Sequence, residues 1–229
     1  MSRQRKSRKT LRLGLFGGTF DPIHNGHLAV ARAARRRFRL DRIYFIPCGR
    51  PPHKDRPGLT PYLHRFTMVA LACMGARGFL PSLLEAGPDL RGRRRYYSIQ
   101  TVRRVRGRGG RRAQLYFLLG ADAFLYLPTW KNFRQLMRLC DFIVANRPGF
   151  DWRRTRPGLP AALGARGGNA SGRIIRLPHS TIHFLRGVHV DISATQIRRT
   201  ARRGQGFGDR VPPRVKDYIE KMKLYQSGR

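Results

Sequence analysis

Short apolar runs alternate with helix-like patterns along most of the chain. A strand is expected where a few apolar residues lie between turn-forming residues, and a helix where apolar positions recur at every third or fourth residue. We therefore expect strands at residues 11–16, 42–46, 79–84, 114–119 and 142–145, and helices at residues 26–38, 61–74 and 97–105. Because strands and helices follow each other in turn, the pattern predicts an α/β fold. It would be a Rossmann-like, doubly wound parallel sheet with helices on both faces.

Two segments fall outside this alternation. Residues 1–10 are basic and polar, and we expect a mobile arm that precedes a single domain at residues 11–229. Residues 150–172 are rich in Gly, Arg, Pro and Ala and show no useful periodicity, so we expect a long flexible loop there.

The composition indicates a cytoplasmic protein. The chain has no apolar run long enough to cross a bilayer, and residues 1–10 lack the apolar stretch of a secretory signal. Its three cysteines, Cys48, Cys73 and Cys140, are scattered and odd in number, which argues against a disulfide framework. We therefore expect a reducing compartment.

The chain is very basic, with 48 Lys and Arg residues against 12 Asp and Glu residues and a formal net charge of +36. Such an excess predicts non-specific affinity for polyanions. However, only seven of the basic residues are lysine, and the arginines are spread over the whole sequence instead of forming one stripe with interleaved aromatic residues. We therefore do not expect nucleic acid to be a specific partner.

The stretch from Gly14 to His27, Gly-Leu-Phe-Gly-Gly-Thr-Phe-Asp-Pro-Ile-His-Asn-Gly-His, carries the strongest chemical signal. The first strand ends near Gly17 and Gly18, whose backbone amides can approach a ligand with no side chain in the way. Thr19 adds a hydroxyl group directly after them. Glycine amides and a hydroxyl group that follow a strand favour a site for phosphate groups.

Two histidines lie three residues apart at the start of the next helix. With Asn25 as the N-cap, the imidazoles of His24 and His27 lie at the positive end of that helix, which favours a polyphosphate. The pair could also be surface or zinc-binding histidines, but no cysteine or carboxylate cluster lies near enough in the sequence to complete a tetrahedral zinc site. We therefore expect no metal site made by the protein alone.

A second helix start lies at residues 192–198, Ile-Ser-Ala-Thr-Gln-Ile-Arg. Ser193 and Thr195 are spaced to cap a helix, and Arg198 lies about one turn further on. This arrangement favours a second site for a triphosphate, with Arg198 neutralising charge on the leaving group. A plain N-cap with a charged, solvated face is the alternative.

The most apolar of the predicted strands ends in Leu-Leu-Gly-Ala-Asp, residues 118–122. Gly120 permits the close approach of a ligand, and Asp122 could accept hydrogen bonds from ribose hydroxyl groups. A helix N-cap is the alternative role for Asp122.

These strings resemble the two signatures of the nucleotidyltransferase superfamily, His-x-Gly-His and Ile-Ser-x-Thr-x-Ile-Arg. Further strings at residues 51–54, 97–98, 128–130 and 147–149 resemble one branch, the bacterial nicotinate-nucleotide adenylyltransferases. The resemblance covers about residues 11–225. It is weakest at residues 87–95, which form a longer and more basic segment than is usual in this branch.

The resemblance implies a role for each matched residue. The residues that act at the reacting phosphate would be Thr19, His24, His27 and Arg198. Those that bind ATP would be Gly17, Gly18, Thr19, His27, Gly120, Asp122, Ser193, Thr195 and Arg198. Those that bind the acceptor would be Lys54, Tyr97, Ser98, Trp130 and Arg147.

The implied reaction joins ATP and nicotinate mononucleotide to give nicotinate adenine dinucleotide and pyrophosphate, a step of NAD biosynthesis. The phosphate of the acceptor is already an anion at neutral pH, so in-line attack needs no nucleophilic residue and no covalent enzyme intermediate. Mg²⁺ would accompany ATP.

Two alternatives stay open. Another adenylyl- or cytidylyltransferase of the superfamily could use the same motifs with a different acceptor, such as phosphopantetheine or nicotinamide mononucleotide. The phosphopantetheine enzymes, however, typically carry threonine in place of the first histidine. A basic nucleic-acid-binding protein is the alternative from a different class, and it predicts affinity that falls steeply with salt, without turnover.

Overall fold

The computed structural model describes residues 10–50, 58–107, 112–145, 151–155, 157–165, 173–188 and 191–226. These residues form a seven-stranded sheet with the order β3-β2-β1-β4-β5-β7-β6. The strands are β1 (Arg12–Gly18), β2 (Arg42–Pro47), β3 (Phe79–Pro81), β4 (Gln114–Gly120), β5 (Asp141–Ala145), β6 (Ile174–Arg176) and β7 (Thr181–Leu185). β6 is antiparallel to β7, whereas the other neighbouring pairs are parallel.

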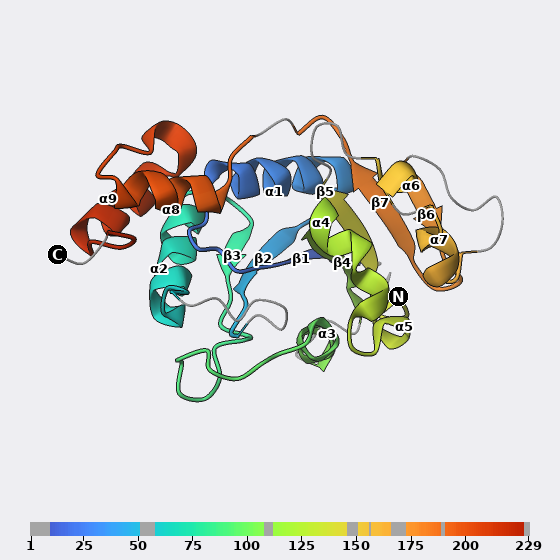
Figure 1. Ribbon diagram of the computed structural model, residues 1–229. Coiled ribbons are helices and arrows are strands. Elements are labelled where there is room, and N and C mark those ends of the chain that lie inside the picture. The colour runs from blue at the N-terminus through green and yellow to red at the C-terminus, as the bar shows by residue number, and fades with distance from the viewer. Residues whose placement is uncertain are drawn as a thin grey trace, which may run out of the picture.

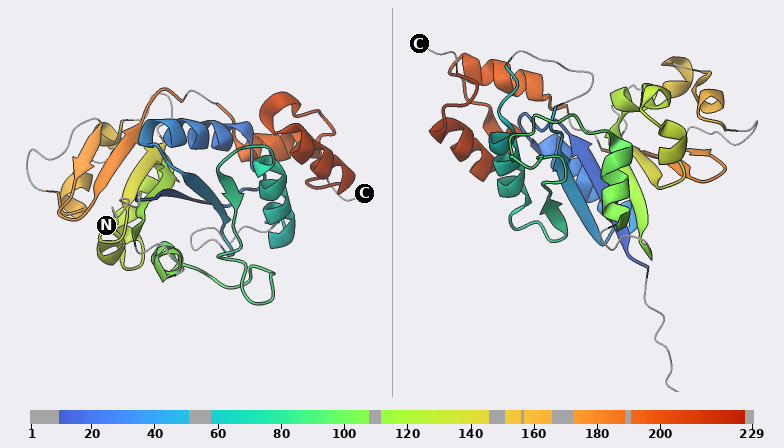
Figure 2. Two further views of the ribbon diagram at one scale, coloured as in Figure 1. Left: turned by 180° about the vertical axis from the view of Figure 1, so that it is seen from behind. Right: turned by 90° about the horizontal axis from the view of Figure 1, so that it is seen from below.

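Helices cover both faces of the sheet, as Figures 1 and 2 show. The helices that contribute side chains to the core on one face are α1 (Asn25–Phe38), α2 (Tyr62–Cys73), α8 (Ala194–Arg202) and α9 (Pro213–Lys221). Those on the other face are α3 (Ser98–Gly107), α4 (Ala121–Leu125), α5 (Phe133–Leu136) and α7 (Leu159–Ala162). Further helical segments among the described residues are α6 (Trp152–Thr155) and the 3₁₀ turns Leu127–Thr129 and Gly208–Arg210.

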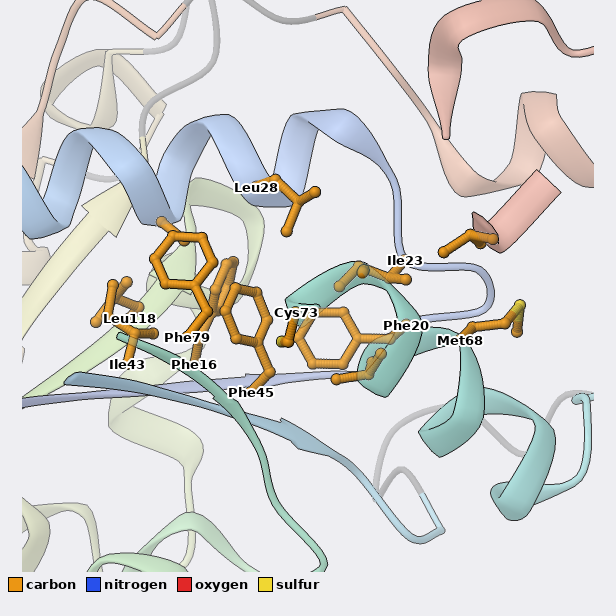
Figure 3. Close-up of a cluster of buried hydrophobic side chains, with 14 of the residues drawn as sticks. Phe16, Phe20, Ile23, Leu28, Ile43, Phe45, Met68, Cys73, Phe79 and Leu118 are labelled. Carbon is orange, nitrogen blue, oxygen red and sulfur yellow. The ribbon is translucent and has the colours of Figure 1, made fainter. Parts of the chain in front are cut away.

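The central strands are buried on both faces because successive side chains of a strand point to opposite sides. Phe16 of β1 and Leu118 of β4 belong to the cluster under α1 and α2, whereas Leu15 and Phe117 belong to the cluster under α3 and α4. Figure 3 shows the first cluster, in which the ring of Phe20 lies beside β1 and α2. This packing holds the carboxyl end of β1 and the residues that follow it in place.

The α/β fold predicted from the sequence is confirmed, and each of the five predicted strands is present. β1 extends two residues beyond the predicted end, to Gly18. β3 is shorter than predicted and ends at Pro81.

Two predicted helix starts are wrong by one residue. The N-cap of α1 is His24, and Asn25 is the first helical residue. The N-cap of α2 is Pro61, whereas Thr60 and Pro61 were expected to be its N-cap and first residue. The backbone of Thr60 has other partners: its amide donates to Asp21 Oδ2 (3.4 Å), and its carbonyl accepts from Arg65 Nε (2.9 Å).

The expected loop at residues 150–172 is partly helical, which corrects the prediction. Its described residues include α6 and α7, each a single turn, and the side chains of Leu159 and Leu163 are buried in the core. One helical turn is too short to show a period in the sequence. Most of the expected N-terminal arm lies outside the described residues, which begin at Thr10.

Two strands and one helix of the C-terminal part were not predicted. β7 has an alternating pattern, in which Ile182 and Phe184 are buried, and this alternation is a strand signal that could have been recognised. β6 has only three residues. α9 begins at Pro213 and buries Val215 and Ile219, which are four residues apart.

Candidate active site

The loop between β1 and α1 lies at the carboxyl end of β1, where open α/β sheets bind their ligands. A Cβ atom at Gly18 would lie only 2.9 Å from the ring of Phe20, so this position needs glycine. At Gly17 the nearest atom, on Phe117, would be 3.4 Å away, which is ordinary contact. Phe20 itself has a φ of 50°, and its ring is buried, so packing holds the loop in this shape.

The two motif histidines lie against each other at the start of α1. Their ring centroids are 3.7 Å apart, with 31° between the ring planes. The backbone amide of His24 donates to Nδ1 of His27 over 3.2 Å. In neutral His27 the proton therefore lies on Nε2. The ring of His27 also contacts the rings of Phe16 and Phe20, with centroids 6.0 and 5.0 Å apart.

Thr19 lies in the loop that follows β1 and contacts the loop that follows β2. Its hydroxyl oxygen accepts from Cys48 Sγ over 3.7 Å, and its carbonyl oxygen accepts from Arg65 Nη1 over 2.9 Å. The Cys48 amide also donates to the Gly18 carbonyl (2.8 Å). The loop after β1 is therefore fastened to the neighbouring loop by both backbone and side-chain bonds.

The second motif meets the first at this point. Ser193 occupies the N-cap position of α8, as the sequence predicts, but its hydroxyl group makes no capping hydrogen bond. Arg198 Nη1 donates to the carbonyl oxygen of Asp21 over 2.6 Å, and its Nη2 donates to Thr195 Oγ1 over 3.3 Å. The fold thus joins two motifs that are 177 residues apart at this contact.

Asp21 is a buried carboxylate of the first motif with partners of its own. Tyr225 donates its hydroxyl proton to Asp21 Oδ1 over 2.7 Å, and the Thr60 amide donates to Oδ2. Burial raises the pKa of the Tyr225 hydroxyl, so Tyr225 stays protonated and acts as a donor. The C-terminal segment therefore supports the loop that carries the histidines.

Gly120 and Asp122 lie at the same end of the sheet as Gly18, at the carboxyl ends of the parallel strands. β4 is the parallel neighbour of β1, and their register pairs Phe16 with Leu118, so Gly120 follows at the level of Gly18. Gly120 is the N-cap of α4, and a Cβ atom there would meet nothing within 4 Å. Asp122 is exposed in the first turn of α4, which excludes the N-cap role.

Three of the five expected acceptor residues lie among the described residues, and these three are close together. Trp130 follows the 3₁₀ turn after α4, is half-buried, and meets the ring of Phe117 edge-on with centroids 5.8 Å apart. Nζ of the neighbouring Lys131 lies 4.6 Å from the ring centroid of Tyr97. Tyr97 directly precedes Ser98 in the sequence. The other two expected residues, Lys54 and Arg147, lie outside the described residues.

The start of α3 has backbone amides of the kind expected to face a carboxylate. The Tyr97 amide is occupied, because it donates to Gln100 Oε1 over 3.1 Å. The next two amides, those of Ser98 and Ile99, belong to the first turn of α3, where amides have no partner within the helix. The Gln100 amide, in contrast, donates to the Tyr97 carbonyl oxygen over 2.8 Å. The carboxylate contact stays a prediction, and Ser98 and Ile99, not Tyr97, are the residues whose amides could make it.

Within the described ranges, no group of three or more His, Cys, Asp or Glu side chains is arranged to hold a metal ion. The same part of the chain contains no helix that is long and apolar enough to span a membrane.

The sequence motifs did not reveal Arg65, Glu85 and Tyr225, whose buried contacts hold the loops and the helix start of the candidate site in place. Arg65 had a signal in the sequence, since it shares the helical face of Met68, Val69 and Ala72 in an otherwise apolar pattern. An arginine at such a position is expected to be buried and hydrogen-bonded. Tyr225 had none, because its contact with Asp21 spans 204 residues.

Comparison with known proteins agrees with this arrangement. A family model described as cytidylyltransferase-like matches residues 15–200. A protein of Pelobacter propionicus named probable nicotinate-nucleotide adenylyltransferase is 38% identical over 219 residues, covering 94% of this chain and 98% of its own. One of the same name from Thermoanaerobacter is 37% identical over 218 residues, covering 95% and 96%.

Solved structures share the fold. The nicotinic acid mononucleotide adenylyltransferase of Plasmodium falciparum, complexed with NaAD, matches with a TM-score of 0.69 at 18% identity, covering 94% of this chain and 97% of its own. The same enzyme complexed with APC gives a TM-score of 0.68 over the same shares. Given the full-length similarity to the curated relatives, the chain belongs to the nicotinate-nucleotide adenylyltransferase family of cytidylyltransferase-like proteins.

Proposed function

We propose that this protein transfers the adenylyl group of ATP to nicotinate mononucleotide, giving nicotinate adenine dinucleotide and pyrophosphate in NAD biosynthesis. One observation carries the proposal beyond family membership: Arg198 of the second motif bonds to the backbone of the first motif, three residues before His24. Two helix N-termini, two imidazoles and a guanidinium group therefore converge on one place, which suits a triphosphate.

In this reaction a phosphate oxygen of the mononucleotide attacks the α-phosphorus of ATP. The bond from that phosphorus to the β-phosphate bridging oxygen breaks, and pyrophosphate leaves with the electron pair. Both reactants are anions, so catalysis consists of holding them in line and balancing the charge of the transition state. No protein nucleophile and no covalent intermediate are required.

The donor half of the site, residues 17–27 and 193–198 with Gly120 and Asp122, would bind ATP. His24, His27 and Thr19 act at the α-phosphate, with the amides of Gly17 and Gly18 beside them. The pyrophosphate part is held by Ser193, Thr195 and Arg198. Gly120 leaves room for the adenosine, and the exposed carboxylate of Asp122 accepts from ribose hydroxyl groups.

The acceptor half, Tyr97, Ser98 and Trp130 together with Lys54 and Arg147, would bind nicotinate mononucleotide. Trp130 packs on the pyridine ring, and the first amides of α3 donate to its carboxylate. Lys54 and Arg147 bind its phosphate group.

A divalent ion, Mg²⁺, is expected to enter with the phosphates of ATP. Asp21 is unsuited as a ligand, because both of its carboxylate oxygens already accept hydrogen bonds from Tyr225 and Thr60. The ion would therefore be held by phosphate oxygens and water, as is usual for Mg²⁺ bound with a nucleotide.

We expect the enzyme to work in the cytoplasm. Cys48, Cys73 and Cys140 are free thiols in the structure. Burial raises the pKa of the Cys73 thiol to about 12, which keeps this thiol protonated and unreactive.

The proposal is tested by measuring pyrophosphate release with ATP and Mg²⁺ in the presence of nicotinate mononucleotide, phosphopantetheine or no acceptor. Release that depends on the mononucleotide, with nicotinate adenine dinucleotide identified by mass spectrometry, is expected. Release with phosphopantetheine alone would identify another branch of the superfamily. Salt-sensitive binding to nucleic acid without any pyrophosphate release would support the class suggested by the +36 charge.

A further inference from the structure

Arg65 is a charged side chain that is almost completely removed from solvent, with 1% of its surface exposed. It donates to four backbone carbonyl oxygens, namely those of Thr19 (2.9 Å), Cys48 (2.8 Å), Gly49 (3.1 Å) and Thr60 (2.9 Å). These carbonyls belong to the loop after β1, the loop after β2 and the segment directly before α2. One guanidinium group therefore fastens three separate pieces of chain.

Glu85 holds the same loop from the other side. Its buried carboxylate accepts from the Gly49 backbone amide and from Thr101 Oγ1 of α3, the latter over 2.6 Å. Arg65 and Arg104 both lie close enough to favour its charged form. Gly49 thus receives a hydrogen bond at its carbonyl from Arg65 and gives one from its amide to Glu85.

Packing at Gly49 leaves no room for a side chain. A Cβ atom there would lie 2.7 Å from the Arg94 carbonyl oxygen, 2.8 Å from that of Glu85 and 3.0 Å from that of Gly92. A continuous series of hydrogen bonds runs from Thr19 through Arg65, Gly49 and Glu85 to Thr101, and we term it the Arg65–Glu85 bridge. Thr19 is half-buried, and the other four residues are buried.

The two ends of this bridge lie in different halves of the site. Thr19 follows the glycines of the donor half, and Thr101 lies one turn after Tyr97 and Ser98 of the acceptor half. We propose that the Arg65–Glu85 bridge is a positioning device that sets the donor loop against the start of α3, so that the two substrates meet in line. This inference rests on the proposed adenylyl transfer.

Stability alone does not account for such a bridge. Burying ionic groups carries a large cost of desolvation, and well-packed apolar residues of similar volume often stabilise a core as well or better. A guanidinium fork, however, can hold several carbonyl groups at fixed directions, which neither lysine nor an apolar side chain can do. The hydrogen bonds of Arg65 to these loops go to backbone carbonyls, and its guanidinium group also lies over the ring of Tyr62, 5.4 Å from the centroid. Arg65 therefore acts through the loops that it holds.

The mildest probe is Thr101→Val, which removes one hydroxyl group at a fully buried position with little change of shape. Arg65→Lys is the stronger probe. Both variants are expected to lower kcat while the KM values for ATP and for the mononucleotide change by less than about threefold. A misplacement of about 1 Å can lower a rate by up to about 100-fold, so we expect a loss of about 10- to 100-fold for Arg65→Lys and less for Thr101→Val.

Arg106→Met is the matched control. Arg106 also donates to two backbone carbonyls, those of Ala113 (2.8 Å) and Leu139 (2.7 Å). These residues precede β4 and β5, so they lie at the amino ends of the strands, away from the candidate site at the carboxyl ends. It is expected to lower the melting temperature and to leave kcat per folded molecule unchanged. A wild-type kcat in folded Thr101→Val and Arg65→Lys would overturn the proposal. An equal loss of kcat per folded molecule in Arg106→Met would also overturn it.

A second readout does not depend on turnover. ATP without acceptor is expected to slow amide hydrogen exchange at residues 97–101 in the wild type, because the bridge carries the ordering of the donor loop to α3. The same addition should leave these amides unchanged in Thr101→Val. If ATP protects them equally in both proteins, the bridge does not couple the two halves, whatever reaction the enzyme catalyses.

Discussion

The donor half and the acceptor half of the site are held together by different forces. In the donor half, side chains bond directly to the backbone: Arg198 to Asp21, and His27 to His24. In the acceptor half, aromatic contacts dominate, with Trp130 edge-on to Phe117 and Lys131 over the ring of Tyr97. Directional bonds suit the concentrated charge of a triphosphate, whereas ring faces suit a flat pyridine. Substitutions in the donor half should therefore have larger effects on the rate.

His24→Ala is expected to have the largest effect. Removal of one group that stabilises developing charge typically costs about 10²- to 10³-fold in kcat. Because His24 is also the N-cap of α1, His24→Asn should be measured beside it, since asparagine preserves a cap without the imidazole. Stopped assays of both folded variants check this prediction.

His64→Gln is the control for the loss of a histidine. His64 Nδ1 is paired with the Tyr218 hydroxyl group at 2.8 Å, between α2 and α9. Its loss should affect stability alone. If His24→Asn keeps normal turnover, the imidazole does not act on the reacting phosphate.

Arg198→Ala is expected to lower kcat/KM for ATP by about 10- to 100-fold. A hydrogen bond to a charged group contributes about 1.5–3 kcal/mol, and about 1.4 kcal/mol corresponds to a factor of ten. Arg198→Lys should rescue only in part, because lysine lacks the planar fork. Initial rates at varied ATP test both variants.

Arg199→Ala removes the same charge from the next, exposed position of α8 and should leave the rate nearly unchanged. A change in the KM of the acceptor alone in Arg198→Ala would mean that the triphosphate lies at the other end of the site.

Trp130→Ala should have a smaller effect, confined to the acceptor. Aromatic stacking contributes about 0.5–1.5 kcal/mol, so the KM for the mononucleotide should rise by up to about tenfold while the KM for ATP stays constant. Tyr126→Ala, an aromatic residue that is 62% exposed on the preceding turn, serves as the control. An effect of Trp130→Ala on ATP alone would remove this residue from the acceptor half.

Glu85→Gln should change the pH dependence of stability. Burial raises the pKa of the Glu85 carboxyl from 4.5 to about 7, against the opposing effects of Thr101, Gly49, Arg104 and Arg65. Tyr62 and Cys48 also face it and interact with its charge. Between pH 4.5 and about 7 the folded state therefore binds more protons than the unfolded state, so the free energy of unfolding falls as pH rises.

Chemical denaturation at pH 5 and pH 8 measures this contribution, which is at most a few kcal/mol because one pKa unit corresponds to about 1.4 kcal/mol. The decline should be smaller in Glu85→Gln than in the wild type. Glu220→Gln, at an exposed position of α9, should retain the wild-type decline. Equal declines in all three proteins would show that Glu85 titrates normally.

The sequence predicted the donor half better than its supports. A strand ending in Gly17-Gly18, followed by two histidines at a helix start, is a local pattern, and local patterns can be read from spacing. The N-cap of α1 could not be predicted to the residue. Asparagine is a common N-cap residue, but the N-cap is His24, whose amide donates to His27.

The buried supports could not be derived in the same way because their partners lie far apart in the chain. Glu85 meets Thr101 across 16 residues, and Tyr225 meets Asp21 across 204. Only Arg65 carried a local signal, as a charged residue on an apolar helical face. Backbone carbonyl groups, which are its partners, have no signature in a sequence.

The most direct test of the central claim is a competition between nicotinate mononucleotide and nicotinamide mononucleotide at equal concentration with ATP. Backbone amides at the start of α3 can bond to both oxygens of a carboxylate, but they meet the NH₂ group of a carboxamide with another donor. An unpaired buried polar group costs about 1–3 kcal/mol, and loss of the anion's attraction to a very basic protein adds to this. We predict that kcat/KM favours the acid by at least about tenfold. Equal use of both mononucleotides would contradict the assignment of nicotinate mononucleotide as the acceptor.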